Sequence, residues 1–355
     1  MAGMAGERVG LVLDAWVKAR APVNIALIKY WGKAPSSLPE DANLPAVPSL
    51  SLSLAGLFTE TWARFAPDAE RDTIRLGGRP LLPEEMRRAV ALLDRIRAVT
   101  EVASPFEIIT VNHVPTAAGL ASSASGMAAL AAAAGRCAGL DPSVPDDLGL
   151  LSEIARIGSG SASRSVYGGW VAWEGRRAHP VAPRDHLPIA VVVAVVGRGR
   201  KAVGSRDAMN HTARTSPYYA GWVQQAHEGF ADALAALAAR DHARLFAAME
   251  RSTWRMHASA MAADPPVFYW QPASVAVLRE VAAMRADGIL CGATLDAGPH
   301  VKVFCDPRDS EAVSRRLTTV PGVEDIIETG PGSGLEMQVG DEPSVGGNDD
   351  SQESA

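Results

Sequence analysis

In the first 200 residues, apolar and polar positions alternate or β-branched residues cluster in six segments, and these patterns predict strands. The segments are 14–21, 49–65, 72–76, 106–112, 165–174 and 189–196. Helical patterns lie between them: an amphipathic stretch at 84–99, an alanine-rich stretch after Ser125, and a stretch at 146–157 behind the start signal Pro145. Strands and helices therefore mix in this part of the chain.

After Gly199 the pattern changes to long helices, interrupted at Pro265 and Pro266. Helices are expected at 217–239, 241–262, 272–286 and 309–317, and short strands at 294–296, 301–305 and 323–328. Elements that neither alternate strictly nor segregate are typical of an α+β fold. The length of the chain favours two domains, and we expect their boundary near residues 190–205.

The chain of 355 residues is 47% hydrophobic, enough to bury a large core. Its formal net charge of −6 and the lack of a long basic block argue against nucleic acids and membranes as partners, while a small anionic substrate remains open. Cys137, Cys291 and Cys305 stand in unrelated contexts without metal-binding spacing, so we expect reduced thiols. No signal peptide or run of 18 apolar residues is seen, which favours a cytoplasmic protein.

Residues 114–126 read Val-Pro-Thr-Ala-Ala-Gly-Leu-Ala-Ser-Ser-Ala-Ser-Gly and lead directly into the alanine-rich helix. Gly119 and Gly126 allow the backbone to approach a ligand closely, and Ser122, Ser123 and Ser125 offer hydroxyls. A helix start adds free amides and a positive dipole end. These features predict a phosphate-binding loop for a nucleoside triphosphate; the alternative is a glycine and serine turn before a buried helix.

Two other stretches place polar residues in apolar surroundings. Asn24, Lys29 and Lys33 interrupt the apolar segment 21–33, where the lysines either present two cations to one region or extend to solvent. Residues 158–169 form a second glycine and serine segment around Arg164, which suits a phosphate or a carboxylate. A flexible linker is the alternative for this second segment.

Asp296 ends an apolar strand before a Gly-Pro turn, and it is either a functional carboxylate or a turn residue that bonds its own backbone. Residues 205–210 follow the basic patch 198–201 and read as a helix start with Ser205 as the cap. Two anion-binding segments, several cations and one carboxylate meet the needs of phosphoryl transfer between two phosphorylated ligands. The common P-loop and dinucleotide motifs are absent from the sequence.

Four stretches together resemble the diphosphomevalonate decarboxylases of the GHMP kinase superfamily. They are Asn24-Ile-Ala-Leu-Ile-Lys-Tyr-Trp-Gly-Lys33, residues 115–126, residues 158–165 and Asp296-Ala-Gly-Pro299, and the resemblance covers most of residues 17–338. It implies a ribosomal-protein-S5-domain-2-like, ATP-binding N-terminal domain at 17–200 and a ferredoxin-like C-terminal domain at 201–338, with the active site in the cleft between them. Outside these domains we expect an N-terminal extension at 1–16 and a disordered acidic tail at 339–355.

The resemblance also implies which residues contact each ligand. ATP with magnesium would lie on Pro115, Ala118, Gly119, Leu120, Ala121, Ser122, Ser123 and Ser125, with Ser123 nearest the metal. The substrate would contact Tyr30, Lys33, Ser159, Ser161, Arg164, Arg206 and Met209. Catalysis would depend on Asp296 at a tertiary hydroxyl, Lys29 beside it, and Arg164 near a carboxylate.

The implied reaction is the ATP-dependent conversion of mevalonate 5-diphosphate to isopentenyl diphosphate in isoprenoid biosynthesis, by a homodimer. The alternatives are a decarboxylase of the monophosphate, a mevalonate-type kinase without decarboxylation, and a non-enzymatic regulator with the same fold. The presence of Lys29, Arg164 and Asp296 argues against the kinase, and the retained aspartate and ATP loop argue against the regulator. His300 stands where the family has asparagine, and Gly204 where it has serine, so contacts made by those two family positions are not carried over.

Overall fold

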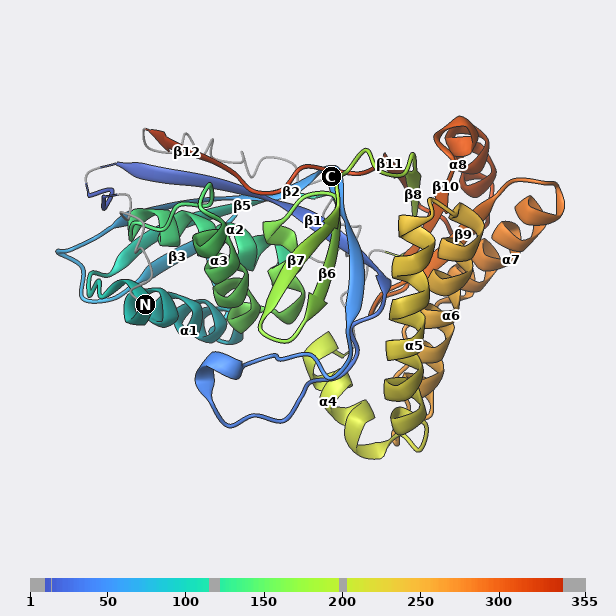
Figure 1. Cartoon of the computed structure of the whole chain (residues 1–355), viewed down its shortest axis with the longest axis horizontal. Coiled ribbons are helices and arrows are strands. Elements are labelled where there is room, and N and C mark those ends of the chain that lie inside the picture. Colours follow the sequence, from blue (N-terminus) through green and yellow to red (C-terminus); the bar gives the residue numbers. More distant parts are fainter. Residues whose placement is uncertain (1–9, 14, 115–121, 198–202, 341–355) are drawn as a thin grey trace, which may run out of the picture.

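The structure, a computed structural model, describes residues 10–13, 15–114, 122–197 and 203–340. Two sheets, each covered by helices, lie side by side along the long axis of the molecule (Figure 1). This arrangement confirms the expected α+β fold with two domains.

The first sheet has eight strands within the described residues, in the order β12-β1-β2-β5-β3-β4, with β6 paired to β2 and β7 to β6. The strands are β1 (Trp16–Ile28), β2 (Ser49–Phe65), β3 (Thr73–Leu76), β4 (Arg79–Pro80), β5 (Phe106–His113), β6 (Trp170–Glu174), β7 (Arg177–Ala182) and β12 (Glu336–Gly340). β1 continues past the expected end at Ala21 because its register shifts between Pro22 and Asn24, which accommodates the proline in the ladder. Lys29 is therefore the first residue to leave the sheet.

Three helices pack on one face of this sheet: α1 (Pro83–Thr100), α2 (Ser122–Cys137) and α3 (Pro145–Gly158). The central one, α2, is buried along residues 128–134, of which only Leu130 is larger than alanine. Small side chains let this helix approach the sheet closely. α2 begins at Ser122, so its first turn includes the serines of the expected phosphate loop.

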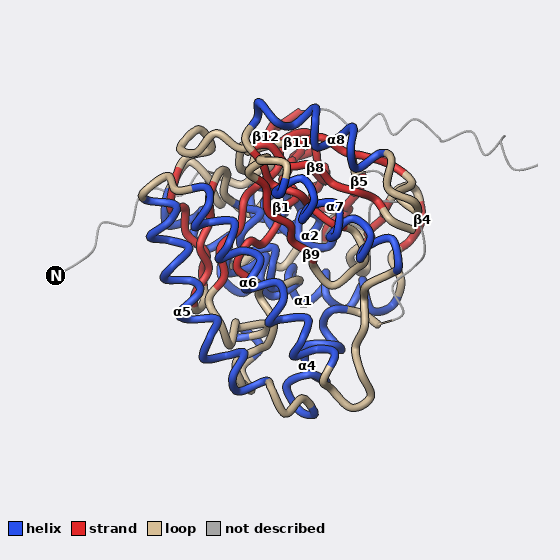
Figure 2. Tube along the Cα trace, turned by 90° about the vertical axis from the view of Figure 1, so that its right-hand side faces the viewer, coloured by secondary structure: helices blue, strands red, loops and turns tan. Residues whose placement is uncertain are grey.

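The second sheet is antiparallel, in the order β11-β8-β10-β9. Its strands are β8 (Ala190–Val195), β9 (Cys291–Leu295), β10 (Val301–Cys305) and β11 (Asp325–Thr329). α5 (Tyr219–Ala238) and α6 (His242–Met261) pack on one face, and α7 (Pro272–Ala286) and α8 (Ser310–Thr318) on the other (Figure 2). Counted along the chain, the strand order is 4-1-3-2, which is the expected ferredoxin-like arrangement.

The expected domain boundary at residue 200 lies one strand too late. β8 precedes that boundary, yet it pairs with both β10 and β11. Its side chains are buried on both faces, with Val193 in one hydrophobic cluster and Val192 in another. A continuous apolar run of this kind is a central strand, so we place the boundary between β7 and β8, at residues 183–189.

The expected tail and the strand at 165–174 also need correction. Val339 and Gly340 belong to β12 and pair with Val17 and Trp16 of β1. Backbone hydrogen bonds do not require apolar side chains, so the polar composition of this segment did not indicate a strand. Residues 160–166 form the 3-10 helix η3 (Gly160–Val166), and the strand begins only at Trp170. Two further short 3-10 helices are η1 (Pro39–Asp41) and η4 (Pro307–Asp309).

A shared hydrophobic cluster joins the two halves. It contains Leu27 and Leu50 of the first sheet, Val193 of β8, Phe230 of α5 and Phe246 of α6. The two domains are therefore packed directly on each other through apolar side chains. Beside this contact lie the long segment after β1 and the helix α4 (Ser205–Thr215) (Figure 1).

All three cysteines are buried free thiols, as expected. Their contexts are not unrelated, however, because Cys291 and Cys305 are directly opposite each other in the β9–β10 register. Burial raises the pKa of the Cys291 thiol to about 11 and that of Cys305 to about 12. Both side chains therefore remain protonated and unreactive near neutral pH.

Candidate active site

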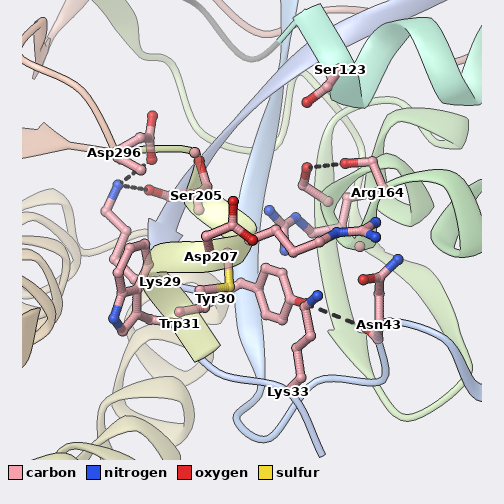
Figure 3. Close-up of a pocket in the computed structure, with 18 of the residues that line it drawn as sticks. Lys29, Tyr30, Trp31, Lys33, Asn43, Ser123, Arg164, Ser205, Asp207 and Asp296 are labelled. Atoms are coloured by element: carbon pink, nitrogen blue, oxygen red, sulfur yellow. Dashed lines mark hydrogen bonds and ion pairs between the residues drawn. The ribbon is translucent and has the colours of Figure 1, made fainter. Parts of the chain in front are cut away.

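A cavity of about 480 Å³ lies where the two domains meet. It is lined by the segment after β1, the junction of α3 and η3, the start of α4 and the turn after β9 (Figure 3). Ten of the residues predicted to bind a ligand or to act in catalysis line it: Lys29, Tyr30, Lys33, Ser123, Ser159, Ser161, Arg164, Arg206, Met209 and Asp296. Folding thus brings segments from both domains together around one cavity that is lined by charged and polar side chains.

Asp296 lies between two buried lysines. Lys29 Nζ is 2.7 Å from Asp296 Oδ1, and Lys302 Nζ is 3.0 Å from Asp296 Oδ2. Lys29 Nζ also donates to the carbonyl of Ala26 at 2.8 Å. The lysine side chains are only 2% and 3% exposed, whereas that of Asp296 is 32% exposed. Asp296 therefore presents to the cavity a carboxylate that is held at both oxygens.

These charges shift the pKa values of the group. Burial lowers the pKa of Lys29 to about 8, with repulsion from Lys302 and Arg164 in the same direction and attraction to Asp296 opposing it. Burial works against ionisation of Asp296, but the two lysines outweigh it and hold the pKa of the carboxyl well below its usual range. At neutral pH the carboxylate is ionised and most of Lys29 is protonated. Asp296 is consequently a weak proton acceptor and a good group for orienting a hydroxyl.

Lys302 was not among the predicted site residues, although the sequence holds a signal for it. It is the second residue of β10, in the otherwise apolar run Val301-Lys-Val-Phe-Cys305. A lysine inside a short buried strand needs a specific partner, and the nearby Asp296 was the available carboxylate.

Arg164 is a buried cation in η3, with 2% exposure. Its Nη1 donates to Ser49 Oγ at 2.6 Å, its Nε donates to Asn24 Oδ1 at 3.3 Å, and its guanidinium lies 5.5 Å from the ring centre of Trp173. Burial lowers the pKa of Arg164 to about 10, so it stays charged at neutral pH. Among the described residues no carboxylate forms an ion pair with it, which leaves this cation able to take an anion from the cavity.

Lys33, which lies away from Asp296 in Figure 3, belongs to a second group of cations and hydroxyls that line the cavity. Burial, together with repulsion from Arg206, lowers the pKa of Lys33 to about 8. Ser159 and Ser161 lie next to each other, with their hydroxyl oxygens 3.4 Å apart. Arg206 Nη2 donates weakly to the carbonyl of Gly158 at 3.4 Å. This end of the cavity offers two cations and two hydroxyls to one anionic group.

The segment after β1 is fastened to α3 beside these serines. Asn43 Nδ2 donates to the last carbonyls of α3, those of Arg156 and Ile157, at 2.9 Å each. The buried guanidinium of Arg156 donates to the carbonyls of Glu40 and Ala42 in the same segment. Asn43 lines the cavity and has a positive φ of 62°, a conformation that asparagine tolerates. Nothing in the sequence pattern pointed to Asn43, because its role depends on the contact between two distant segments.

The serines at the start of α2 have different surroundings. Ser123 is exposed and lines the cavity. Ser125 is fully buried, and its Oγ lies 2.7 Å from Thr59 Oγ1 of β2. The Ser125 hydroxyl is therefore directed toward the sheet, and its expected contact with a ligand stays a prediction. The side chain of Ser122 and the predicted residues Pro115, Ala118, Gly119, Leu120 and Ala121 lie outside the described part.

A smaller cavity of about 110 Å³ adjoins the first and shares Arg88 and Ser123 with it. Most of its other lining is apolar: Ile74, Leu76, Leu81, Ala89, Met127 and Leu130. Glu84, Arg87 and Arg88 of α1 line the main cavity. The sequence pattern did not point to these three residues, because charges on an amphipathic helix usually face solvent.

The two departures from the family pattern occupy structural positions. His300 is buried, and its Nδ1 accepts a hydrogen bond from the N–H of Val196 at 3.1 Å. Gly204 is the N-cap of α4 and Ser205 is its first residue, without a side-chain capping bond. The expectation that Ser205 caps the helix is therefore wrong by one residue, and Ser205 instead lines the cavity.

Within the described ranges, no group of three or more His, Cys, Asp or Glu side chains is placed to hold a metal ion. In the same part of the chain, no helix is long and apolar enough to span a bilayer.

Comparison with known proteins agrees with this geometry. Residues 21–180 match the diphosphomevalonate decarboxylase-like N-terminal domain, and residues 191–339 match the mevalonate 5-diphosphate decarboxylase C-terminal domain. The second match begins within β8, in agreement with the revised boundary.

Similar proteins cover most of the chain. The diphosphomevalonate decarboxylase of Candida albicans is 32% identical over 88% of this chain and 95% of its own length. The crystal structure of mevalonate diphosphate decarboxylase from Staphylococcus aureus is 36% identical, with a TM-score of 0.84 over 91% of this chain and 98% of its own. A further structure, MDDEF in complex with MVAPP, AMPPCP and magnesium, is 36% identical, with a TM-score of 0.83 over 91% of this chain and 99% of its own. The chain therefore belongs to the diphosphomevalonate decarboxylase family.

Proposed function

We propose that this protein catalyses the ATP-dependent decarboxylation of mevalonate 5-diphosphate to isopentenyl diphosphate. The observation that carries the proposal is that one cavity holds three separate features for one ligand. These are the carboxylate of Asp296 between two lysines, the buried Arg164 without an ion-pair partner among the described residues, and the group around Lys33 and Arg206. Mevalonate diphosphate has three matching groups: a tertiary hydroxyl, a carboxylate and a diphosphate.

Each substrate group is assigned to the feature of opposite or complementary chemistry. The diphosphate lies against Lys33, Arg206, Ser159 and Ser161, with Tyr30 and Met209 lining its path. The carboxylate lies near Arg164, and the hydroxyl faces Asp296. Gly160 is needed in this wall, because a Cβ there would lie 2.8 Å from the Tyr30 hydroxyl.

ATP would enter beside α2. Ser123 lies at the first turn of this helix, where free amides and the dipole favour phosphate groups. The adjoining apolar cavity of about 110 Å³ is suited to a flat base. Magnesium, when bound, would neutralise phosphate charge. Among the described residues, we assign the Ser123 hydroxyl to hold it together with the ATP phosphates.

The chemistry follows from the poor leaving ability of hydroxide. Transfer of the γ-phosphoryl group of ATP to the tertiary oxygen releases ADP and the hydroxyl proton, and turns that oxygen into part of a phosphate leaving group. The bond from carbon to phosphate oxygen then breaks as CO₂ leaves, and the electrons of the broken carbon–carbon bond form the alkene. Asp296 orients the hydroxyl for the first step, and Lys29 supplies positive charge as phosphate charge develops.

The decisive experiment is incubation of the purified protein with ATP, magnesium and either mevalonate, its monophosphate or its diphosphate. We expect CO₂ and ADP to form in equal amounts with the diphosphate. The monophosphate should lose about tenfold or more in kcat/KM, because unpaired buried donors cost on the order of 1 to 3 kcal/mol each. ADP without CO₂ would identify a kinase, and preference for the monophosphate would overturn the assignment of the diphosphate.

The lowered lysine pKa values predict a loss of activity in alkali. Lys29 and Lys33 are protonated below their pKa values of about 8 and lose the proton as the pH rises through them. Since kcat/KM reports the free enzyme, it should fall above about pH 8. The variants Lys29→Arg and Lys33→Arg, measured separately, should each shift part of this alkaline fall in kcat/KM (the alkaline limb of the profile) to higher pH. A pH profile that is flat to pH 9.5 would contradict both assignments.

We further propose that the protein acts as a cytoplasmic homodimer. The buried free thiols suit a reducing compartment. Light scattering coupled to gel filtration should give twice the monomer mass of 37.3 kDa. A single peak at the monomer mass would contradict the dimer.

A further inference from the structure

Lys302 lies at a core-facing position where an apolar residue would be expected. In the antiparallel register it is paired with Thr294 of β9 and Val193 of β8. Phe304, two residues along and therefore on the same face of β10, packs near Phe246 of α6 with 6.5 Å between ring centres. A buried ammonium among such neighbours is costly unless a charge compensates it.

The compensating charge is Asp296, but this carboxylate already has a partner. Lys29 takes one oxygen at 2.7 Å and Lys302 takes the other at 3.0 Å. The cluster therefore has two positive charges and one negative charge, an excess of one positive charge beside the cavity. Lys302 is not among the residues that line the cavity, so it acts on a ligand through Asp296 and Lys29 rather than by direct contact.

We propose that Lys302 is the positioning residue of the reaction: it clamps the second oxygen of Asp296 and supplies the excess positive charge that prepares Lys29 and Asp296 for a polyanionic transition state. This inference rests on the proposed function and assigns a role to a residue outside the binding surface. With both oxygens held, rotation of the carboxylate is restricted, so its remaining lone pairs have fixed directions and one of them can accept from the hydroxyl.

Three other charged or titratable groups lie near this cluster, and each is expected to keep its charge state near neutral pH. They should therefore not interfere with a test of Lys302. Arg164 of η3 faces it from the first domain, and its charge stays constant below about pH 10. Burial lowers the pKa of His257 of α6 to about 3, and burial raises that of Tyr30 far above neutrality, so both remain neutral. Between pH 6 and 9 we therefore expect Lys29 to change its charge, whereas Arg164, His257 and Tyr30 should keep theirs.

Lys302→Met is the test, because methionine keeps the length of the side chain in apolar surroundings and removes the charge. Loss of repulsion from Lys302 should raise the pKa of Lys29, and loss of attraction should raise that of Asp296. We expect kcat to fall about tenfold or more with a smaller change in KM, and the part of the alkaline limb that Lys29 contributes to move to higher pH by about one to two units, while the part from Lys33 stays in place. Lys302→Arg should keep the limb near its original position.

The chain contains five lysines, at positions 18, 29, 33, 201 and 302, so lysine labelled with ¹³C at Cε gives few NMR signals. The Lys29 signal, assigned from its loss in Lys29→Arg, should titrate near pH 8 in the parent protein and one to two units higher in Lys302→Met. This measurement needs no substrate. It therefore tests the role of Lys302 even if the proposed reaction is wrong.

Phe304→Leu is the matched control, since it disturbs packing on the same face of β10 without a change in charge. It should leave the Lys29 titration in place. An unmoved Lys29 titration in Lys302→Met, or a shift equal to that in Phe304→Leu, would overturn the proposal. If Lys302→Met does not fold, a Lys302→Arg variant with altered Lys29 titration and unchanged melting temperature would overturn it as well.

Discussion

Replacement of Asp296 by asparagine should lower turnover by about a hundredfold or more, the contribution of a positioned catalytic group. Asparagine keeps the shape of the side chain but removes the charge that pairs with Lys29 and Lys302. It can no longer accept hydrogen bonds at both of its terminal atoms, so the reacting hydroxyl loses its fixed partner. Steady-state rates with ATP and mevalonate diphosphate are the measurement.

The same substitution leaves two buried lysines without a counter-ion, so the melting temperature should fall as well. The double variant Asp296→Asn with Lys302→Met separates the two effects, because it leaves a single buried lysine in the cluster. We expect it to regain part of the lost stability without regaining turnover. Recovery of both together would mean that Asp296 acts through stability alone.

Asp306→Asn is a suitable control for this series. Asp306 is the N-cap of η4, where its side chain accepts from the backbone N–H of Arg308, and asparagine caps equally well. Its rate should stay within about twofold of the parent protein. A variant at Asp296 that retains more than a tenth of the parent rate would remove Asp296 from the mechanism.

The second large effect is expected for Arg164→Lys, although the charge is retained. A guanidinium can donate to Ser49 and Asn24 and still present a planar pair of N–H groups to a carboxylate, whereas an ammonium cannot do all three. We expect kcat/KM for mevalonate diphosphate to fall by about a hundredfold, with little change in the KM for ATP. Steady-state kinetics with each substrate varied in turn provide the test.

Arg97→Lys is the matched control for that variant. Arg97 also donates to oxygen acceptors and lies over an aromatic ring, Phe106 at 5.3 Å, but it stands on α1 and does not line the cavity. Its kinetics should be nearly unchanged. If Arg164→Lys behaves like Arg97→Lys, Arg164 is a structural residue and the substrate carboxylate is bound elsewhere.

Local patterns in the sequence were sufficient for much of this protein. Strand β2 and helix α3 follow directly from alternation and from the Pro145 start signal, because their side-chain periodicity and helix start are local properties. The glycine and serine segments and the flanking cations indicated phosphorylated ligands for the same reason: anion binding needs particular residue types in a short span. The motifs around Lys29, Arg164 and Asp296 then indicated the family.

Only the tertiary structure could assign β8 to the second sheet, since a strand takes its place from its partners β10 and β11 rather than from its own pattern. The same holds for Ser125, whose position on α2 turns it to Thr59 of β2, and for Asn43, whose side chain caps a helix far along the chain. Lys302 is the clearest case. Its sequence neighbours mark it as buried, but only the pairing of β9 with β10 brings its ammonium to the free oxygen of Asp296, because a charge cluster depends on distances that no local pattern contains.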